Sequence, residues 1–139
     1  MRLIRFAIIS LILLFIVFFV VSLAIPSHIR ISRAIDIIAT KKKVFNDIND
    51  LKVWDKWNQF TTNSALTNKT FSEPSSGNSA FMKADQINIV ITESTLDSVK
   101  TKWDQTNAKH FEGGFNIMEL RTGTITVQYY FDFHFFNFL

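Results

Sequence analysis

The chain has 139 residues, with 15 Lys and Arg against 12 Asp and Glu, so its formal net charge is +3. Two of the basic residues, Arg2 and Arg5, precede an uncharged segment, and residues 26–139 carry a net charge of only +1. This balance excludes the strong positive field of a nucleic-acid-binding protein. The absence of cysteine excludes disulfides, thiolate zinc sites and cysteine nucleophiles.

The longest apolar segment runs from Phe6 to Ile25 and contains no charged residue. As a helix, a segment of this length spans about 30 Å, the hydrocarbon thickness of a bilayer. Ser22-Leu23-Ala24 fits a signal-peptide cleavage site, but the apolar run is longer than a signal peptide needs. We therefore expect a membrane anchor over residues 1–26 and one domain over residues 27–139, with cleavage of the anchor as the alternative.

Basic residues lie on both sides of this segment and leave the orientation of the domain poorly determined. Arg2 and Arg5 face Arg30, Arg33 and the lysines at 41–43 across it, and basic residues favour the cytoplasmic side. A five-residue tail nevertheless stays inside most simply, so we expect a single-pass protein of the cell membrane with an extracytoplasmic domain.

Residues 29–38 alternate between apolar and polar side chains, with Arg33 interrupting the apolar row, and this predicts a half-buried strand. Helical spacing follows, because Val44, Ile48 and Leu51 fall at i, i+4 and i+7. The sequence therefore predicts one short amphipathic helix directly after the first strand.

Trp54 and Trp57 follow this helix. They would share a face if the helix continued, or lie on a tight turn if it did not. A large ring with a polar N–H suits the mouth of an apolar cavity, and ordinary packing at the edge of the core is the alternative.

The remaining sequence repeats short strand signals separated by turns, with Gly113-Gly114 expected in a loop. Successive hairpins of this kind build an antiparallel sheet with one apolar side. The predicted fold class is α+β, with an N-terminal transmembrane helix followed by an antiparallel sheet and one short helix. The predicted strands are near residues 67–72, 80–83, 87–93, 98–103, 115–120 and 125–135.

Familiar catalytic motifs are absent from the sequence, which has no HExxH, no GxSxG and no phosphate-binding loop. Asp132 and His134 would share one strand face and could form an acid–base or metal pair, but no third ligand is evident. We therefore expect no enzyme, no catalytic residue, no cofactor and no metal.

Three segments in order, Ile31–Ala39, Val44–Leu51 and Trp54–Trp57, resemble the START-like superfamily. The sequence is more narrowly similar to the polyketide cyclase/dehydrase and lipid-transport group of bacterial proteins, some of which begin with one membrane helix. Phe111–Phe115 and Tyr130–His134 add to this similarity. The resemblance implies a helix-grip fold, in which an antiparallel sheet and its helices enclose an apolar cavity.

The end of the sequence departs from that group, whose members close the cavity with a long C-terminal helix. The one amphipathic helix predicted here is too short to cover such a sheet. We expect a truncated domain, with a partner protein covering the sheet as the alternative.

The resemblance and the apolar sheet face lead to one leading hypothesis, non-enzymatic binding of a lipid or other hydrophobic molecule beside the bilayer. The alternatives are a tethered domain that docks a protein partner through its exposed sheet face, and a cyclase or dehydratase that uses Asp132 and His134. The residues expected to line the cavity are Trp54, Trp57, Phe81, Ile89, Trp103 and Phe115.

Overall fold

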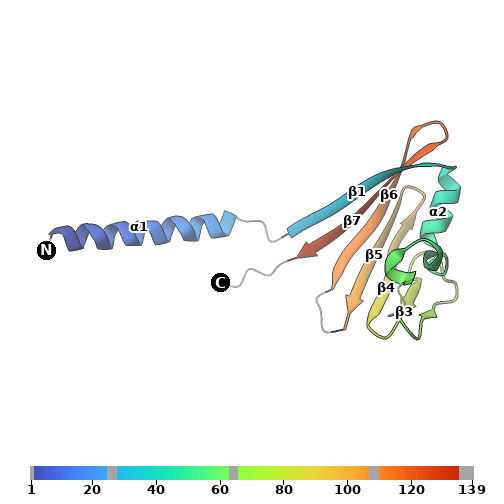
Figure 1. Ribbon diagram of the computed structural model, residues 1–139, viewed down its shortest axis with the longest axis horizontal. Coiled ribbons are helices and arrows are strands. Elements are labelled where there is room, and N and C mark those ends of the chain that lie inside the picture. The colour runs from blue at the N-terminus through green and yellow to red at the C-terminus, as the bar shows by residue number, and fades with distance from the viewer. Residues whose placement is uncertain (1, 25–27, 63–65, 107–109, 135–139) are drawn as a thin grey trace. The chain divides into compact units, whose positions relative to one another are not determined.

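The computed structural model describes residues 2–24, 28–62, 66–106 and 110–134. The chain divides into two compact units, one containing the N-terminal helix and the other spanning Arg30–Phe133 (Figure 1).

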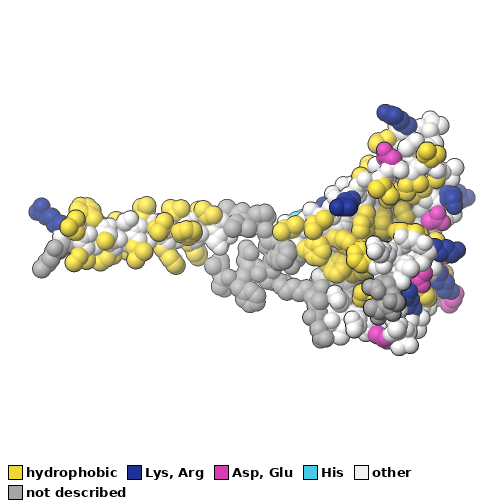
Figure 2. Space-filling model, in the orientation of Figure 1, with side chains coloured by type: hydrophobic (Ala, Val, Ile, Leu, Met, Phe, Trp, Pro, Cys, Tyr) yellow, Lys and Arg dark blue, Asp and Glu magenta, His cyan; other side chains and the backbone are white. Residues whose placement is uncertain are grey.

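Helix α1 extends from Arg2 to Ala24 and includes all of the expected apolar segment except Ile25, which lies outside the described residues. Its large apolar side chains are 47% to 84% exposed. Figure 2 shows apolar side chains along the visible face of the helix. A helix that is apolar on every side is typical of a membrane span. By length and composition, α1 is long and apolar enough to cross a bilayer.

The other unit is built on a sheet of seven strands in the order β1-β7-β6-β5-β4-β3-β2. This confirms the predicted α+β class with an antiparallel sheet. Its strands are β1 (His28–Ile38), β2 (Thr70–Phe71), β3 (Phe81–Lys83), β4 (Ile87–Thr95), β5 (Ser98–Gln105), β6 (Phe111–Arg121) and β7 (Thr124–His134). Its helices are α2 (Lys41–Asn49), η1 (Val53–Lys56) and α3 (Gln59–Thr62).

Helices α2 and η1 lie on one face of the sheet, which we call the inner face (Figure 1). The residues that pack on this face form the apolar core of the domain. Register sets which residues share this face, because Phe115 pairs with Val99 on one side and with Tyr129 on the other. Alternation along each strand then places every second residue in the same layer. The middle of the inner layer of β4 and β5 is buried, with Ile89, Ile91 and Val99 all 0% exposed.

Helix α2 packs on this inner face through Val44 and Ile48, which are both buried. The chain then turns, so that Trp54 lies in η1 and Trp57 caps it, and the tight-turn alternative is correct. The Trp54 indole N–H donates to the Ile48 carbonyl oxygen at 2.7 Å, which fixes η1 against the end of α2. The Asn49 side chain accepts a hydrogen bond from the Ser94 hydroxyl at 2.6 Å and ties α2 to β4.

The predicted loop around Gly113 and Gly114 is wrong, because both glycines lie inside β6. A Cβ on Gly113 would lie 2.8 Å from the ring of Phe131, and one on Gly114 would lie 2.8 Å from the Val99 carbonyl oxygen. The glycines therefore mark a close approach of neighbouring strands, which is the other common meaning of glycine in a strand pattern.

Candidate functional site

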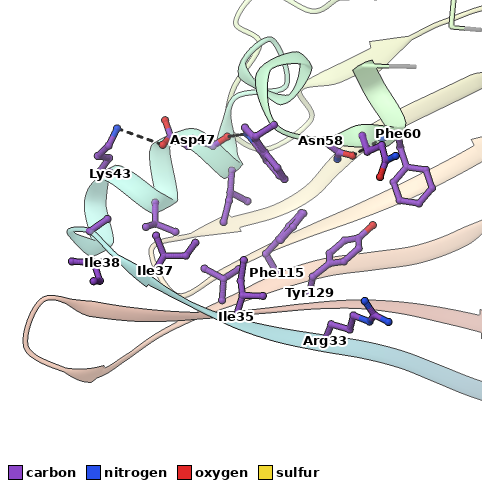
Figure 3. Close-up of a pocket in the computed structure, with 16 residues that line it drawn as sticks. Arg33, Ile35, Ile37, Ile38, Lys43, Asp47, Asn58, Phe60, Phe115 and Tyr129 are labelled. Carbon is purple, nitrogen blue, oxygen red and sulfur yellow. Dashed lines mark hydrogen bonds and ion pairs between the residues drawn. The ribbon is translucent and has the colours of Figure 1, made fainter. Parts of the chain in front are cut away.

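A cleft of about 700 Å³ lies on the inner face of the sheet. Its floor is formed by β1, β6 and β7, and its walls by α2 and the segment that follows η1 (Figure 3). The apolar lining consists of Ile35, Ile37, Ile38, Ala39, Val44, Ile48, Trp57, Phe60, Phe115, Val127 and Tyr129. The polar lining consists of Arg33, Lys43, Asp47, Asn58 and Gln59.

Strand β1 supplies one side of the cleft. Its alternating isoleucines face the cleft because successive side chains of a strand point to opposite faces. Ile35 is 61% exposed even though it lies on the apolar face of the sheet. Figure 2 shows apolar side chains gathered on this face. The cleft is therefore open to solvent along β1.

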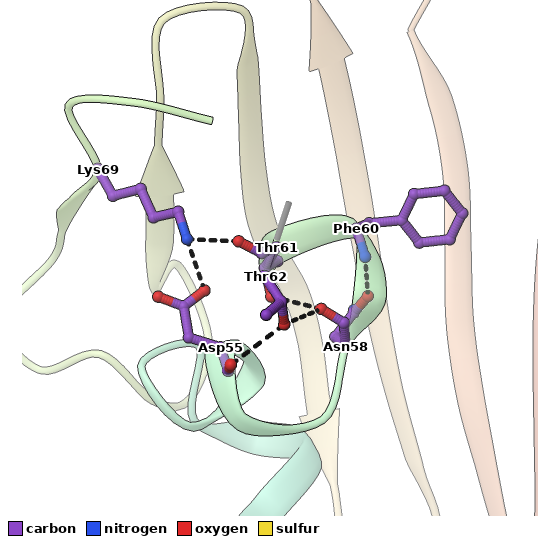
Figure 4. A network of polar contacts seen from close by, with 6 residues as sticks. All are labelled: Asp55, Asn58, Phe60, Thr61, Thr62 and Lys69. Carbon is purple, nitrogen blue, oxygen red and sulfur yellow. Dashed lines mark hydrogen bonds and ion pairs between the residues drawn. The ribbon is translucent and has the colours of Figure 1, made fainter. Parts of the chain in front are cut away.

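Opposite β1, the short segment from Asn58 to Thr62 is held by a network of polar contacts (Figure 4). The Asn58 side chain accepts a hydrogen bond from the Phe60 backbone N–H at 3.0 Å, and the Thr62 hydroxyl donates to the Asn58 carbonyl at 2.8 Å. Lys69 contacts the Asp55 carboxylate at 2.9 Å and also donates to the Thr61 carbonyl.

This network leaves Phe60 projecting over the inner face with 58% of its surface exposed. Its ring meets Trp103 and Phe131 edge-on, at centroid distances of 6.2 and 6.3 Å. A single turn of helix rarely holds its shape alone, so the contacts of Asn58 and Lys69 are what position Phe60 at the edge of the cleft.

Below Phe60, stacked rings form a continuous aromatic wall. Phe115 stacks on Tyr129 with a centroid distance of 4.7 Å, and Tyr129 meets Phe131 edge-on at 4.5 Å. Trp54 and Trp57 both pack against Phe115, at 5.6 and 6.0 Å. Offset and edge-on arrangements are the favourable geometries for such pairs.

Few polar groups enter this apolar surface. Arg33 projects from β1 into the cleft and makes no hydrogen bond or ion pair with any described residue. The Tyr129 hydroxyl oxygen is buried and has no hydrogen-bond partner among the described residues, and burial raises the pKa of this hydroxyl. Lys43 and Asp47 face each other along α2 at 3.7 Å.

The structure places the six predicted lining residues in three different environments. Trp57 and Phe115 line the cleft. Trp54, Ile89 and Trp103 are buried in the apolar core behind it, with exposures of 0%, 0% and 3%. Phe81 pairs with Val90 on the outer face, where it is 39% exposed. A role in ligand contact stays a prediction for each of them.

Several cleft residues were not predicted from the sequence, among them Ile35, Phe60 and Tyr129. For Tyr129 a signal was present, because its hydroxyl stands in an otherwise apolar row of β7. The sequence shows that Arg33 interrupts the apolar row of β1, but no function was predicted for this residue. Phe60 carried no such signal, since its position depends on the contacts that Lys69 makes with Asp55 and with the neighbouring Thr61 carbonyl.

On the outer face, Asp132 is engaged by Arg30 through two hydrogen bonds of 2.7 Å each. The side chain of His134 lies outside what the structure describes, so its pairing with Asp132 stays a prediction. Among the described residues, no three His, Asp or Glu side chains form a group that could hold a metal ion.

No protein-family model and no curated protein matches the sequence. Solved structures are similar in fold, including a truncated norcoclaurine synthase from Thalictrum flavum (TM-score 0.60, 5% identity, covering 78% of this chain and 76% of that one). CalU16 from Micromonospora echinospora has a TM-score of 0.52 at 7% identity, over 76% of this chain and 60% of that one. An HSP90 activator from Plasmodium falciparum has a TM-score of 0.55 at 9% identity, over 73% of this chain and 71% of that one.

At these identities the likeness shows the fold alone, and the fold is the helix-grip α+β fold that the resemblance implied. The polyketide cyclase/dehydrase group, the membrane anchoring and the truncation stay predictions. The chain spans only 60% of CalU16.

The prediction that the protein is not an enzyme is overturned. Norcoclaurine synthase is an enzyme by name and shares this fold. The prediction rested on the absence of familiar motifs such as HExxH and GxSxG, and those motifs belong to other folds. One fold can carry unrelated functions, so neither the fold nor the missing motifs exclude catalysis.

Proposed function

We propose that this protein is a membrane-anchored domain that binds a lipid or another hydrophobic molecule in its inner-face cleft. The observation that carries the proposal is the cleft itself, with its volume of about 700 Å³ and a mostly apolar lining. Cavities of roughly 300–1,000 Å³ with apolar walls and a few polar groups are typical of small-molecule sites.

Burial of apolar surface would drive binding, because each ligand methylene that leaves water for the cleft contributes about 0.8 kcal/mol. Trp57 and Phe115 would contact the ligand, and Trp54, Ile89 and Trp103 would support the wall behind them. Phe81 pairs with Val90 on the outer face, away from the residues that line the cleft, so its role in ligand contact stays a prediction.

The anchor gives the cleft access to ligands dissolved in the bilayer. Strand β1 begins at His28, four residues after α1 ends at Ala24. An anchor joined to the domain by so few residues would hold the domain near the bilayer, where hydrophobic molecules are concentrated, and would raise their effective concentration at the cleft.

The test is lipid analysis of the full-length protein purified in detergent, comparing wild type with Ile35→Trp. Ile35 is exposed and lines the cleft, so a larger ring there fills the site while the fold is kept. The matched control is Ala34→Trp, one residue along β1 on the opposite face. We expect a stoichiometric hydrophobic molecule in wild type and in Ala34→Trp, and its loss in Ile35→Trp. Lipid-free wild-type protein would contradict the proposal.

A second candidate is docking of a protein partner, favoured by the exposure of Ile35, Trp57 and Phe60 on one face, at 61%, 44% and 58%. A fold neighbour named as an HSP90 activator is compatible with this role. Docking predicts a stable complex that Ile35→Trp disrupts and no stoichiometric small molecule. The same pair of variants therefore distinguishes the two functions.

A further inference from the structure

We propose that the ligand of the cleft is an amphiphile with an anionic head group, carboxylate or phosphate, which Arg33 and Tyr129 bind. This inference rests on the proposed function and assigns the chemical class of the ligand. Two polar groups point to this class, the guanidinium of Arg33 and the hydroxyl of Tyr129. Neither has a hydrogen-bond or ion-pair partner among the described residues.

Arg33 occupies a position that the strand pattern reserves for an apolar side chain. It lies between Ile31 and Ile35 in the inward row of β1, and it lines the cleft. The other charges of the cleft, on Lys43 and Asp47, lie within 3.7 Å of each other. The guanidinium of Arg33 is thus the one cationic group of the described cleft that has no carboxylate partner.

From two side-chain contacts on the outer face we infer the alignment of β1 with β7. Arg30 binds Asp132, and Asp36 accepts a hydrogen bond from Thr126 at 2.6 Å. From the first contact to the second, β1 advances six residues while β7 recedes by six, as antiparallel strands do. Arg33 is the midpoint between Arg30 and Asp36 on β1, and Tyr129 is the midpoint between Asp132 and Thr126 on β7. This alignment therefore places Arg33 opposite Tyr129.

Cross-strand neighbours of this kind have Cβ atoms about 4.5–5.5 Å apart. Arg33 and Tyr129 therefore stand side by side on the floor of the cleft, and Figure 3 shows both directed into it. The Tyr129 hydroxyl is buried without a partner. A buried hydroxyl normally has a hydrogen-bond partner. An oxygen of a bound anion would supply one when the ligand displaces a neighbouring side chain that shields the hydroxyl from solvent.

Both groups suit an anion. Guanidinium groups bind carboxylate and phosphate through paired N–H donors. Burial raises the pKa of the Tyr129 hydroxyl, so this group stays a neutral donor. From Arg33 to Ile38 the cleft follows β1 for about 16 Å at roughly 3.3 Å per residue, which accommodates an acyl chain.

The test uses the full chain in phosphatidylcholine nanodiscs and two probes of equal length, ω-bromoundecanoate and ω-bromoundecanol. Bromine quenches tryptophan fluorescence on contact. The cleft contains Trp57, whereas α1 contains no tryptophan. Quenching that is lost in Trp57→Phe therefore reports occupancy of the cleft.

We expect the acid to bind wild type at least about tenfold more tightly than the alcohol, because an ion pair in an apolar site contributes of that order. Arg33→Met should abolish this preference by weakening acid binding about tenfold. The matched control, Arg121→Met, removes the same charge at the end of β6 and should behave as wild type. Tyr129→Phe removes one hydrogen bond and should weaken acid binding about threefold.

Equal binding of acid and alcohol by wild type would overturn the head-group inference and leave the proposed function intact. An equal loss of both probes in Arg33→Met would also overturn it. Failure of both probes to quench wild type would overturn the proposed function as well. If Arg33→Met does not fold, Tyr129→Phe is the deciding variant. Weaker binding of the acid with unchanged binding of the alcohol would support the inference, and an unchanged preference for the acid would overturn it.

A second arm identifies the source of the head group. In nanodiscs of phosphatidylglycerol, a membrane phospholipid that occupies the cleft would protect wild type from quenching and would not protect Arg33→Met. Unchanged quenching would assign the site to a free fatty acid. Both results support an anionic head group.

Discussion

The inner face of the sheet has two halves. Both have alternating apolar and polar residues along their strands, but the apolar side chains are buried in one half and exposed in the other. On β4 and β5, Ile89, Ile91 and Val99 are 0% exposed, in one apolar cluster with Leu51 and Trp54. On β1, Ile31 and Ile35 are 58% and 61% exposed. The difference lies in what covers each half, because α2 and η1 pack over the first and the cleft opens over the second.

The two halves are also held to the sheet by different forces. The covered half is stabilised by burial of apolar surface. Strand β1 is an edge strand, and polar contacts on its outer face hold it at both ends, with Arg30 bound to Asp132 and Asp36 bound to Thr126. Because these contacts are on the outer face, the inner face of β1 does not need to be covered by another element and can contact a ligand.

The largest expected effect is a difference in the free energy of unfolding when isoleucine is replaced by alanine in the covered half and in the open half of the inner face. Ile91→Ala should lower the free energy of unfolding by about 2–5 kcal/mol, since it empties a packed core position. Ile35→Ala should change it by less than about 0.5 kcal/mol, because this side chain is exposed. Urea unfolding of the full chain can be followed by tryptophan fluorescence, because all three tryptophans lie between residues 54 and 103. Equal losses would show that something covers β1 in solution.

An intermediate effect is expected for Arg30→Met, which removes two hydrogen bonds from the buried Asp132 carboxylate and the stacking of Arg30 on Tyr130 at 4.6 Å. Amide hydrogen exchange should accelerate along β1 and stay unchanged in β4 and β5. Arg121→Met is the control for loss of charge. Uniform acceleration throughout the sheet would indicate that β1 and the core form one cooperative unit.

The smallest effect concerns alkaline pH. The folded-state pKa of Tyr129 is raised above its unfolded value near 10, because burial disfavours the ionised form. Its contribution to stability is therefore fully present below about pH 10 and is lost as the pH rises through the folded pKa. Tyr129→Phe should lose less stability than wild type between neutral pH and about pH 11. Identical pH profiles would mean that the hydroxyl is accessible to solvent.

Local pattern was sufficient for most of the fold. Period-two alternation predicted β1 and β7, and helical spacing predicted α2, because these periods depend only on which side chains face the core. Gly113 and Gly114 were misread because a loop and a close approach of strands require the same small residue. The pairing of β1 with β7 was not predictable, since it joins residues about a hundred positions apart.

The candidate site was less predictable than the fold. Trp57 and Phe115 line the cleft, whereas Trp103 and Ile89, with the same apolar character, lie in the core behind it. Sequence alone cannot separate these groups, because an inward-facing apolar residue becomes core or cavity wall according to whether another element lies above it.

The sequence by itself determined an apolar segment long enough to cross a membrane, the alternating strands and the absence of cysteine chemistry. These properties follow from residue type and local spacing. Only the tertiary structure decided that β1 pairs with β7 and that Arg33 and Tyr129 line the same cleft. The physical reason is that exposure and charge pairing depend on which distant segments meet, and this depends on the packing of the whole domain.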